Sequence, residues 1–463
     1  MTVQTELEPN LRDTSGFAGH PKGLGPLFFT ELWERFSYYG MRSILILYLT
    51  STAAQGGLGF DVKKASSIYG WYTMAVYLTA LPGGWIADYL TGARLAVLIG
   101  GIIIAFGHFS MVFHSSSFVF LGMGLIAIGT GLLKPNISVM VGNLYARNDP
   151  RRDSGFSIFY MGINVGALLA PLVVGYLAKG ETFKGFLTAI GQDPTKAWHW
   201  GFGAAGVGMI LGLIVYTLHG KQLARIEDKL PTAAKIKLKS GGTKAPPLTK
   251  DEWARIGAIV ILFVFTILFW AAYEQKGASL NLFADKLVST EILGISFPAP
   301  FLQSLTPAFV ILLTPLFSIL WVRMRERQPS SPSKFTFGLL LIGLAYLLIV
   351  PAAWLTAQGR VSFWWLVGLY FVEVCGEMCL SPVGLSTVTK LAPAKVAGLM
   401  MGAWFLATSI GNKLAGYLSG FFVASDSWRL VKLYGGISAG LLVAAVILAM
   451  ATPGIKRLMG KAA

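Results

Sequence analysis

The amino-acid sequence predicts an all-α polytopic membrane protein with 12 transmembrane helices. Hydrophobic residues make up 54% of the 463-residue chain and charged residues only 13%, whereas soluble domains carry about 25% charged residues. Apolar runs close to the length of a membrane helix, about 20 residues, recur from one end of the chain to the other. The 21 prolines and 54 glycines also suit membrane helices, which pack closely through small residues and tolerate breaks.

Twelve apolar segments of suitable length follow one another along the chain. We place them near residues 25–51, 66–90, 93–113, 117–145, 154–178, 198–219, 253–276, 301–323, 334–356, 361–390, 395–424 and 429–451. An even number of spans puts both termini on the same side of the membrane.

The distribution of lysine and arginine predicts the orientation. Cations gather in the loops after the even-numbered spans, namely Arg94, Arg147, Arg151, Arg152, residues 221–255, Arg323, Arg325, Arg327, Lys334, Lys390 and Lys395. Cytoplasmic loops are enriched in these residues, so we expect a multi-pass protein of the plasma (inner) membrane with both termini cytoplasmic and a polar N-terminal tail, residues 1–23. This bias also explains the net charge of +16. Membrane lipid is therefore an expected partner, and nucleic acid is not.

One long polar connection divides the chain. Residues 220–252 are rich in lysine, glycine and proline, and we interpret them as a cytoplasmic linker between an N-terminal six-helix bundle, 1–219, and a C-terminal six-helix bundle, 253–463. Two six-helix halves joined in this way resemble the major facilitator fold. In that fold the site lies near the bilayer midplane, between halves that rock against each other.

The first predicted span carries a stripe of charged and aromatic side chains. Glu31, Arg35, Tyr38 and Arg42 are spaced so that they share one face of a helix, with Glu34 beside them. Ionisable side chains within a membrane span are costly in lipid, face the interior and indicate a functional site. We therefore expect this stripe to line a polar cavity.

Few other charges lie within the predicted spans. Lys134, Glu274, Glu373 and Glu377 are the candidates for the interior. Acidic Glu274 and Glu377 in the second half can pair with basic Arg42 and Lys134 in the first, and such pairs can form and break as the halves rock. Permanent structural pairing is the alternative, and Glu373 has no obvious partner in the sequence.

The stripe also suggests the kind of ligand. Arg35 and Arg42 lie about 10 Å apart along a helix axis, a length that two or three extended residues also span at about 3.5 Å each. A zwitterion needs fixed cations and anions at opposite ends of a cavity. The residues that can supply these ends are Arg35, Arg42, Lys134, Asn164, Glu274 and Glu377. The walls would be Tyr38, Tyr39, Tyr77 and Trp404.

Seven motifs in order along the chain resemble those of the proton-dependent oligopeptide transporter (POT, or PTR) family. The most specific is Glu-x-x-Glu-Arg-Phe-Ser-Tyr-Tyr at residues 31–39. The others are Gly-Gly-Trp-Ile-Ala-Asp at 83–88, Gly-Thr-Gly-Leu-Leu-Lys-Pro-Asn at 129–136, Phe-Tyr-Met-Gly-Ile-Asn-Val-Gly at 159–166, Phe-Trp-Ala-Ala-Tyr-Glu-Gln at 269–275, Gly-Glu-Met-Cys-Leu-Ser-Pro at 376–382 and Trp-Phe-Leu-Ala-Thr at 404–408. The resemblance implies uptake of di- and tripeptides coupled to inward proton movement.

The resemblance also implies residue roles. Proton coupling would rest on Glu31, Glu34 and Arg35. Peptide-binding residues would be Arg35, Arg42, Tyr38, Tyr39, Tyr77, Lys134, Asn164, Glu274, Glu377 and Trp404, with Arg35 and Lys134 near the carboxylate and Asn164 and Glu377 at the amine. Gate pairs would be Arg42 with Glu274 outside and Lys134 with Glu377 inside. We expect a monomer, driven by the proton gradient, with no cofactor and no metal.

Three departures from the family pattern are visible. Residues 220–252 are too short and charged for the two extra helices of many bacterial relatives. Thr306 stands where bacterial members commonly have Asn, and Gly70 where animal members have a coupling His. Without that His, coupling must fall on carboxylates.

The sequence is also compatible with two other functions. A related transporter could carry another anion, such as nitrate or a glycosylated metabolite. A membrane-embedded enzyme or sensor is more distant, because the sequence contains no Gly-rich phosphate loop, paired metal ligands or nucleophile with base and orienting group.

Overall fold

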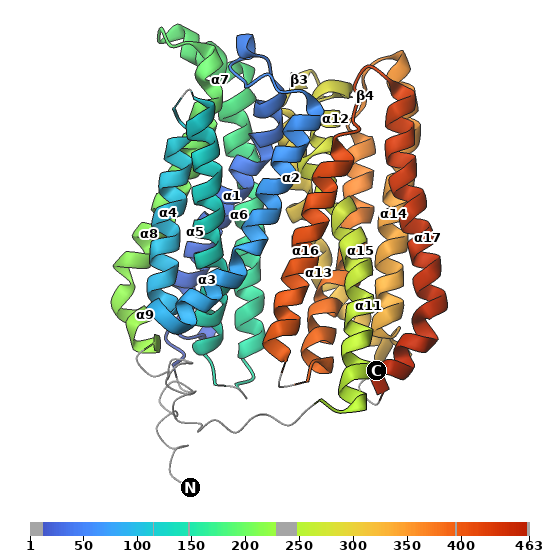
Figure 1. The fold of residues 1–463 in the computed structure, drawn as a ribbon. Coiled ribbons are helices and arrows are strands. Elements are labelled where there is room, and N and C mark those ends of the chain that lie inside the picture. Colours follow the sequence, from blue (N-terminus) through green and yellow to red (C-terminus); the bar gives the residue numbers. More distant parts are fainter. Residues whose placement is uncertain (1–12, 114, 147–148, 228–247, 394–395, 461–463) are drawn as a thin grey trace. The chain divides into compact units, whose positions relative to one another are not determined.

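The computed structural model describes residues 13–113, 115–146, 149–227, 248–393 and 396–460, and almost all of their secondary structure is helical (Figure 1). Within these ranges nine helical segments are long and apolar enough to cross a membrane. They are Ala93–Ser110, Ser116–Asn143, Arg152–Lys179, Pro194–Leu218, Lys250–Leu287, Ala299–Met324, Ser331–Gln358, Trp364–Leu391 and Ser427–Met459. The prediction of a helical, multi-pass membrane protein is confirmed, and the exact number of twelve spans stays a prediction.

Helices also occupy the three remaining predicted spans, but they are more polar or shorter. Helix α1 (Leu24–Thr50) carries the four charges of the first-span stripe. Helix α2 (Val62–Leu78) has 17 residues and is followed by the separate α3 (Ala80–Ile86) and the π-helix η4 (Ala87–Thr91). In α16 (Ala397–Ser419), Asn412 and Lys413 lower the mean hydropathy.

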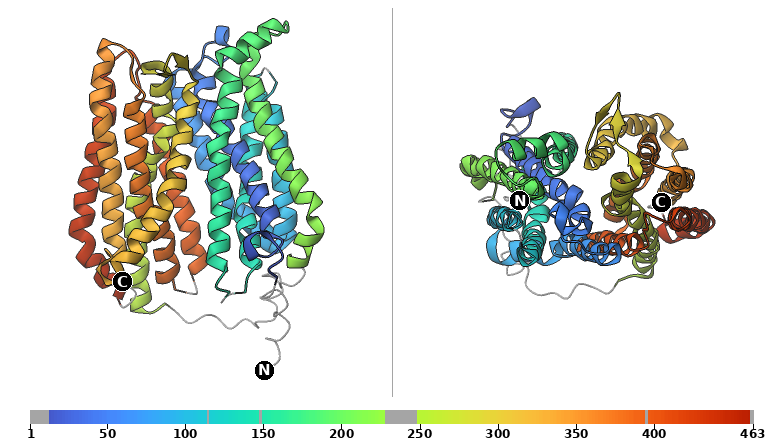
Figure 2. Two further views of the ribbon diagram at one scale, coloured as in Figure 1. Left: turned by 180° about the vertical axis from the view of Figure 1, so that it is seen from behind. Right: turned by 90° about the horizontal axis from the view of Figure 1, so that it is seen from above.

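The chain folds into two compact units. The first comprises Met1–Ile44 and Ala75–Thr243, and the second comprises Leu45–Met74 and Lys244–Ala463. The helices of each unit run side by side and are seen nearly end-on in the right-hand view of Figure 2. The predicted bundles 1–219 and 253–463 remain a prediction. Residues 1–12 of the predicted tail, residues 228–247 of the linker, Arg147 and Lys395 lie outside the described residues.

The first unit is built around close contact between two glycine-rich helices. Besides most of α1, all of α3 and η4 and the end of α2, it contains η2 (Phe17–Gly19), α4 (Ala93–Ser110), α5 (Ser116–Asn143), α6 (Arg152–Lys179), α7 (Glu181–Ala189), η5 (Pro194–Lys196), α8 (Ala197–Leu218) and α9 (Gly220–Glu227). Helices α4 and α5 meet at Gly100 and Gly129, where a Cβ atom on either glycine would lie 2.6 Å from the other's carbonyl oxygen. Neither position can therefore hold a side chain without moving a backbone.

The second unit packs α14 against α15 and α17, and α11 against α16. Besides α16 and most of α2, it contains η3 (Ala53–Gln55), α11 (Lys250–Tyr273), η6 (Glu274–Gly277), α12 (Ser279–Leu287), η7 (Ala299–Ser304), α13 (Leu305–Met324), η8 (Arg325–Arg327), α14 (Ser331–Leu355), η9 (Thr356–Gln358), α15 (Trp364–Leu391) and α17 (Ser427–Met459).

Four short strands in the second unit correct the prediction of a wholly α-helical chain. Strand β1 (Val288–Ser289) pairs in parallel with β4 (Val361–Ser362), and β2 (Glu291–Ile292) pairs antiparallel with β3 (Ile295–Ser296). Leu293 and Gly294 turn between β2 and β3 with φ of 51° and 81°, the sign that a two-residue type I′ turn requires at both positions. Strands of two residues are too short to leave an alternating pattern in the sequence.

Part of α2 packs tightly on α16 within the second unit. Ser66 Oγ donates to Ser419 Oγ at 3.0 Å, and Ser409 Oγ donates to the Met74 carbonyl at 2.8 Å. Between these bonds the two backbones touch, since a Cβ atom on Gly416 would lie 2.5 Å from the Gly70 Cα atom. This contact gives a physical reason for glycine at position 70.

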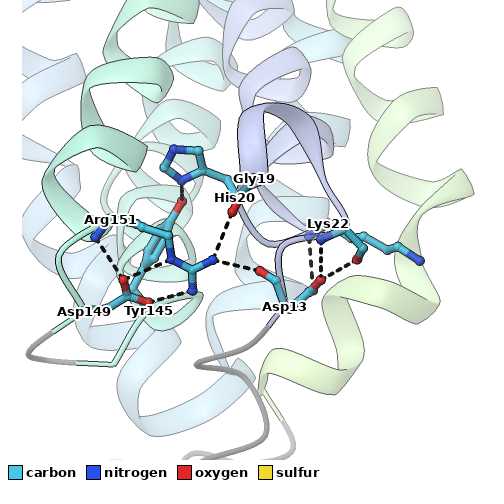
Figure 3. Close-up of polar contacts among 8 residues, drawn as sticks. Asp13, Gly19, His20, Lys22, Tyr145, Asp149 and Arg151 are labelled. Carbon is cyan, nitrogen blue, oxygen red and sulfur yellow. Dashed lines mark hydrogen bonds and ion pairs between the residues drawn. The ribbon is translucent and has the colours of Figure 1, made fainter.

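A polar cluster fixes the N-terminal segment to the loop between α5 and α6 (Figure 3). Arg151 Nη1 donates to the carbonyls of Asp13 and Gly19, both at 3.0 Å, and Arg151 Nη2 donates to Asp149 Oδ2 at 2.9 Å. Buried His20 places Nδ1 2.8 Å from the Tyr145 hydroxyl. Hydrogen bonds from the Arg151 side chain hold the pKa of the Asp149 carboxyl below its ordinary value.

Leucine at position 129 should destabilise the protein, because its Cβ atom would collide with the Gly100 carbonyl. We expect Gly129→Leu to lower the free energy of unfolding by about 1–3 kcal/mol, measured as thermal unfolding in detergent. Gly124→Leu on the same helix is the matched control, since a Cβ atom there has no neighbour within 4 Å. Equal melting temperatures for the two variants would contradict the close α4–α5 contact.

Loss of the Arg151 side chain should release the N-terminal segment. We expect Arg151→Ala, and not Arg152→Ala, to speed amide exchange over residues 16–24 at neutral pH, measured by hydrogen–deuterium exchange mass spectrometry.

The stability that the Asp149–Arg151 pair gives to the N-terminal segment should depend on pH. A carboxyl with a lowered pKa stabilises the fold above its unfolded pKa, and this contribution is lost as the pH falls through the lowered value. After correction for intrinsic exchange rates, the amides of residues 16–24 in the wild type should therefore stay protected from exchange in mild acid. They should lose this protection only in stronger acid. Protection that disappears near neutral pH would argue against the Asp149–Arg151 pair.

Candidate functional site

The stripe on α1 forms a buried ion cluster in the first unit. Arg35 Nε lies 3.2 Å from Glu31 Oε1 and also donates to Glu34 Oε2. None of the three side chains is more than 2% exposed. The structure thus brings together the three residues predicted for proton coupling, and their role remains a prediction.

The cluster leaves hydrogen-bonding capacity unused. Glu31 Oε2, Glu34 Oε1 and Arg35 Nη2 are buried, and none has a hydrogen-bond partner among the described residues. A buried polar atom without a partner costs about 1–3 kcal/mol, and more when it belongs to a charged group. The two glutamate oxygens are therefore suited to take up a proton, and Arg35 Nη2 is suited to bind an anionic ligand.

Glycines on α6 set how closely that helix approaches the cluster. A Cβ atom on Gly166 would lie 2.2 Å from the Leu32 carbonyl oxygen and 3.1 Å from the Arg35 Cβ atom. Asn164 lies on α6 two residues before Gly166, is 7% exposed, and donates from Nδ2 to the Tyr160 carbonyl of its own helix at 3.0 Å. Its predicted contact with an amine therefore stays a prediction.

Tyrosine rings lie against the cations of the first unit. The Arg35 Cζ atom is 5.4 Å from the Tyr38 ring centroid, and the Arg42 Cζ atom is 5.9 Å from the Tyr39 centroid. Cations within about 6 Å of an aromatic centroid are attracted by the ring. Both tyrosines predicted to shape a cavity on α1 therefore contact the cations of that helix.

Lys134 is the other predicted cation of this unit, and it comes from α5. Its Nζ atom lies 4.1 Å from the Tyr77 centroid, and it is near enough to interact electrostatically with Glu31. Lys134 and Tyr77 thus extend the ion cluster from α1 to α5 and the end of α2.

The second unit has its own buried acidic group. Tyr273 OH donates to Glu377 Oε2, and Lys276 Nζ lies 3.1 Å from the Tyr273 ring centroid. Glu274 and Glu377 are 3% and 7% exposed, and Glu373 is 0% exposed. The predicted acids of the second half are therefore buried beside a lysine and a tyrosine.

Tyr273 and Lys276 were not among the predicted site residues. Tyr273 precedes Glu274 within the motif at residues 269–275, and this position was the sequence signal that could have identified Tyr273. Lys276 was at the end of the predicted span 253–276, where a lysine usually marks the membrane surface. In the structure the chain continues through η6 into α12, so Lys276 is buried at 8% exposure.

Trp404 is the remaining predicted site residue of the second unit, and Thr306 is one of the departures from the family pattern. The Trp404 ring lies 6.0 Å from that of Phe263, and Gly384 makes room for it, since a Cβ atom there would be 2.3 Å from the indole. Thr306 is 5% exposed, and its hydroxyl has no hydrogen-bond partner in the described part of the chain.

The predicted gate pairs draw one residue from each unit. Arg42 and Lys134 belong to the first unit, and Glu274 and Glu377 to the second. Both pairs therefore stay predictions.

Comparison with known families identifies the group to which the chain belongs. The model of the POT family (PTR2) matches residues 94–229 and 247–435, more than half of the chain. The chain belongs to the POT family. The family resemblance predicted from the motifs is confirmed.

Individual relatives of the POT family match nearly the whole chain. The peptide transporter YePEPT of Yersinia enterocolitica subsp. palearctica serotype O:3 (strain YE-P4) is 36% identical over 505 residues, covering 96% of each chain. The di-/tripeptide transporter of Lactococcus lactis subsp. lactis (strain IL1403) is 36% identical over 503 residues, covering 96% of this chain and 97% of the relative. A crystal structure of a mutant of the peptide transporter POT in complex with alafosfalin has a TM-score of 0.87 at 39% identity, covering 97% of this chain and 98% of that one.

Proposed function

We propose that this POT-family chain is a proton-coupled symporter that imports di- and tripeptides by alternating access. The observation that carries the proposal is the Arg35 guanidinium, which is buried between Glu31 and Glu34 and keeps Nη2 without a partner among the described residues. A guanidinium is suited to carboxylates because it presents several donors in a fixed plane. Two relatives named as peptide transporters, each 36% identical, support peptides as the cargo.

The finer architecture is part of the same proposal. Twelve helices form two six-helix halves, 1–219 and 253–463, of a major facilitator fold, and residues 220–252 form the linker between them. The protein is a monomer in the plasma (inner) membrane, with both termini cytoplasmic, and the proton gradient drives it without a cofactor. The nine apolar helical segments and the lysine and arginine bias of the loops support this arrangement.

Charge balance explains how a proton couples to a peptide in the first unit. Two negative charges, Glu31 and Glu34, are balanced by two positive charges, Arg35 and Lys134. A proton on one glutamate leaves one positive charge in excess, and a peptide carboxylate then restores neutrality. Because unpaired charge is costly in a buried site, proton and peptide each make binding of the other more favourable.

The proposal assigns the peptide amine to a second group of residues. Glu377, oriented by Tyr273, and Asn164 of the first unit would hold the peptide amine, and Trp404 would shape the pocket. Arg42 with Glu274 on the outer side and Lys134 with Glu377 on the inner side act as alternating gates. Binding through the termini and backbone permits varied side chains, since specificity for one side chain would need a dedicated pocket.

Substituting Glu34 should separate transport from its driving force. In proteoliposomes with an imposed pH gradient, we expect the wild type to accumulate labelled dialanine above its external concentration. Glu34→Gln should lose this accumulation and keep peptide exchange in the absence of a gradient, because it removes a protonatable group while Arg35 remains. Glu181→Gln is the matched control, since this glutamate is 82% exposed.

The outcomes distinguish the possible functions. Full gradient-driven accumulation by Glu34→Gln would show that the coupling assignment is wrong. Gradient-driven accumulation of nitrate by a wild type that does not accumulate dialanine would instead favour an anion transporter. Binding of dialanine without accumulation by the wild type would favour a sensor, and turnover of dialanine would favour an enzyme.

A further inference from the structure

We propose that Glu373 is a second proton-binding site of the transport cycle, separate from the Glu31, Glu34 and Arg35 cluster. The proposal rests on the proposed symport function and adds a proton carrier in the second unit. Glu373 lies on α15, one helical turn before Glu377, so the two carboxyl groups share one face of that helix.

The surroundings of Glu373 favour its protonated form. The side chain is 0% exposed, and neither carboxyl oxygen has a hydrogen-bond partner among the described residues. A buried charge without a partner carries a desolvation penalty on the order of several kcal/mol. A neutral carboxylic acid largely avoids this penalty. In this arrangement Glu373 therefore holds a proton.

The titratable groups around Glu373 come from four elements. Lys276 and Glu274 of η6 and Glu377 of α15 interact with it electrostatically. Tyr346 of α14 and Tyr370 of α15 are also near, and Tyr434 of α17 lies beside Tyr346 with ring centroids 6.2 Å apart.

Two of these tyrosine hydroxyls are engaged with backbone. Tyr346 OH donates to the Ala272 carbonyl at 2.8 Å, and Tyr434 OH donates to the Ser279 carbonyl at 3.3 Å. Neither hydroxyl proton is therefore directed at Glu373.

Like charges decide which carboxyl keeps the proton. Glu274, Glu373 and Glu377 share the neighbourhood of one lysine, Lys276, and neighbouring carboxylates cannot all ionise without repulsion. Glu377 accepts a hydrogen bond from Tyr273, which favours its charged form. Glu373 has no such bond within the described residues, so it is the group that stays neutral.

A break in the helix gives this proton a way to be released. Between η6 and α12, Ala278 has φ −123° and ψ −104°, outside the helical region. In the proposed cycle, Lys276 and Glu274, which precede this break, shift relative to α15. Discontinuous helices of this kind commonly form ion sites in transporters.

The proton step is a simple exchange. A hydronium ion from the outer side transfers its proton to a carboxylate oxygen of Glu373 and leaves as water, so one O–H bond breaks and one forms. When Lys276 moves towards Glu373, the O–H bond of Glu373 breaks, the proton passes to a water molecule on the inner side, and the carboxylate remains paired with the lysine ammonium.

The proton-to-peptide ratio tests the proposal directly. In proteoliposomes, the membrane potential that just balances a known dialanine gradient gives this ratio. We expect Glu373→Gln to lower it by one proton per peptide, while dialanine exchange without a gradient stays near the wild-type rate. Glu373→Asp, which retains a carboxyl group, should keep the wild-type ratio, and the exposed Glu291→Gln in the same unit is the matched control.

A structural role for Glu373 predicts a different result. If Glu373 only fills space as a neutral residue, Glu373→Gln will keep the full ratio, and that outcome would overturn the proposal. If the wild type does not accumulate dialanine at all, the symport function itself fails, which this assay separates from a failure at Glu373.

A measurement on the wild type covers the case in which the variants do not fold. Dicyclohexylcarbodiimide reacts with protonated carboxyl groups in apolar surroundings. We expect mass spectrometry to find Glu373 modified in the wild-type protein, with labelling that falls as the pH rises. Labelling of other buried glutamates without Glu373, or labelling of Glu373 that does not change with pH, would contradict a titrating proton site.

Discussion

The buried guanidinium of Arg35 is the constraint on which the first unit depends. It sits between two carboxylates, and removing one partner of a buried ion pair destabilises a protein by about 3–5 kcal/mol. Gly166 allows the α6 backbone to close over Leu32 and Arg35. A proton on Glu31 or Glu34 therefore leaves an excess positive charge beside Arg35. A ligand carboxylate is one group that can balance this charge.

The two units use a similar combination of side chains. In the first, Lys134 lies on the Tyr77 ring and near Glu31, and in the second, Lys276 lies on the Tyr273 ring while Tyr273 donates to Glu377. An ammonium is attracted by the face of an aromatic ring, in addition to any interaction with carboxylates. Each unit thus places a lysine, a tyrosine and a glutamate close together.

The sequence predicted the parts of the site that lie on one regular helix. Glu31 and Arg35 are four residues apart, and helical geometry alone brings them together. The sequence did not predict that Lys276 is buried, because its burial depends on the helix break at Ala278 and on the continuation of the chain into α12. Nor did it predict that Arg151 holds the Asp13 carbonyl, 138 residues away, since such contacts depend on tertiary packing. The two-residue strands were too short for any sequence pattern.

The contact between Gly70 and Gly416 limits which side chains position 70 can hold. A histidine at position 70, as in animal members, would need the α2 and α16 backbones to separate, because a Cβ atom there would lie 3.0 Å from the Gly416 Cα atom. One substitution would therefore damage the fold before it offered a new proton acceptor. The close approach of the two helices therefore excludes a larger side chain at position 70 unless α16 changes as well.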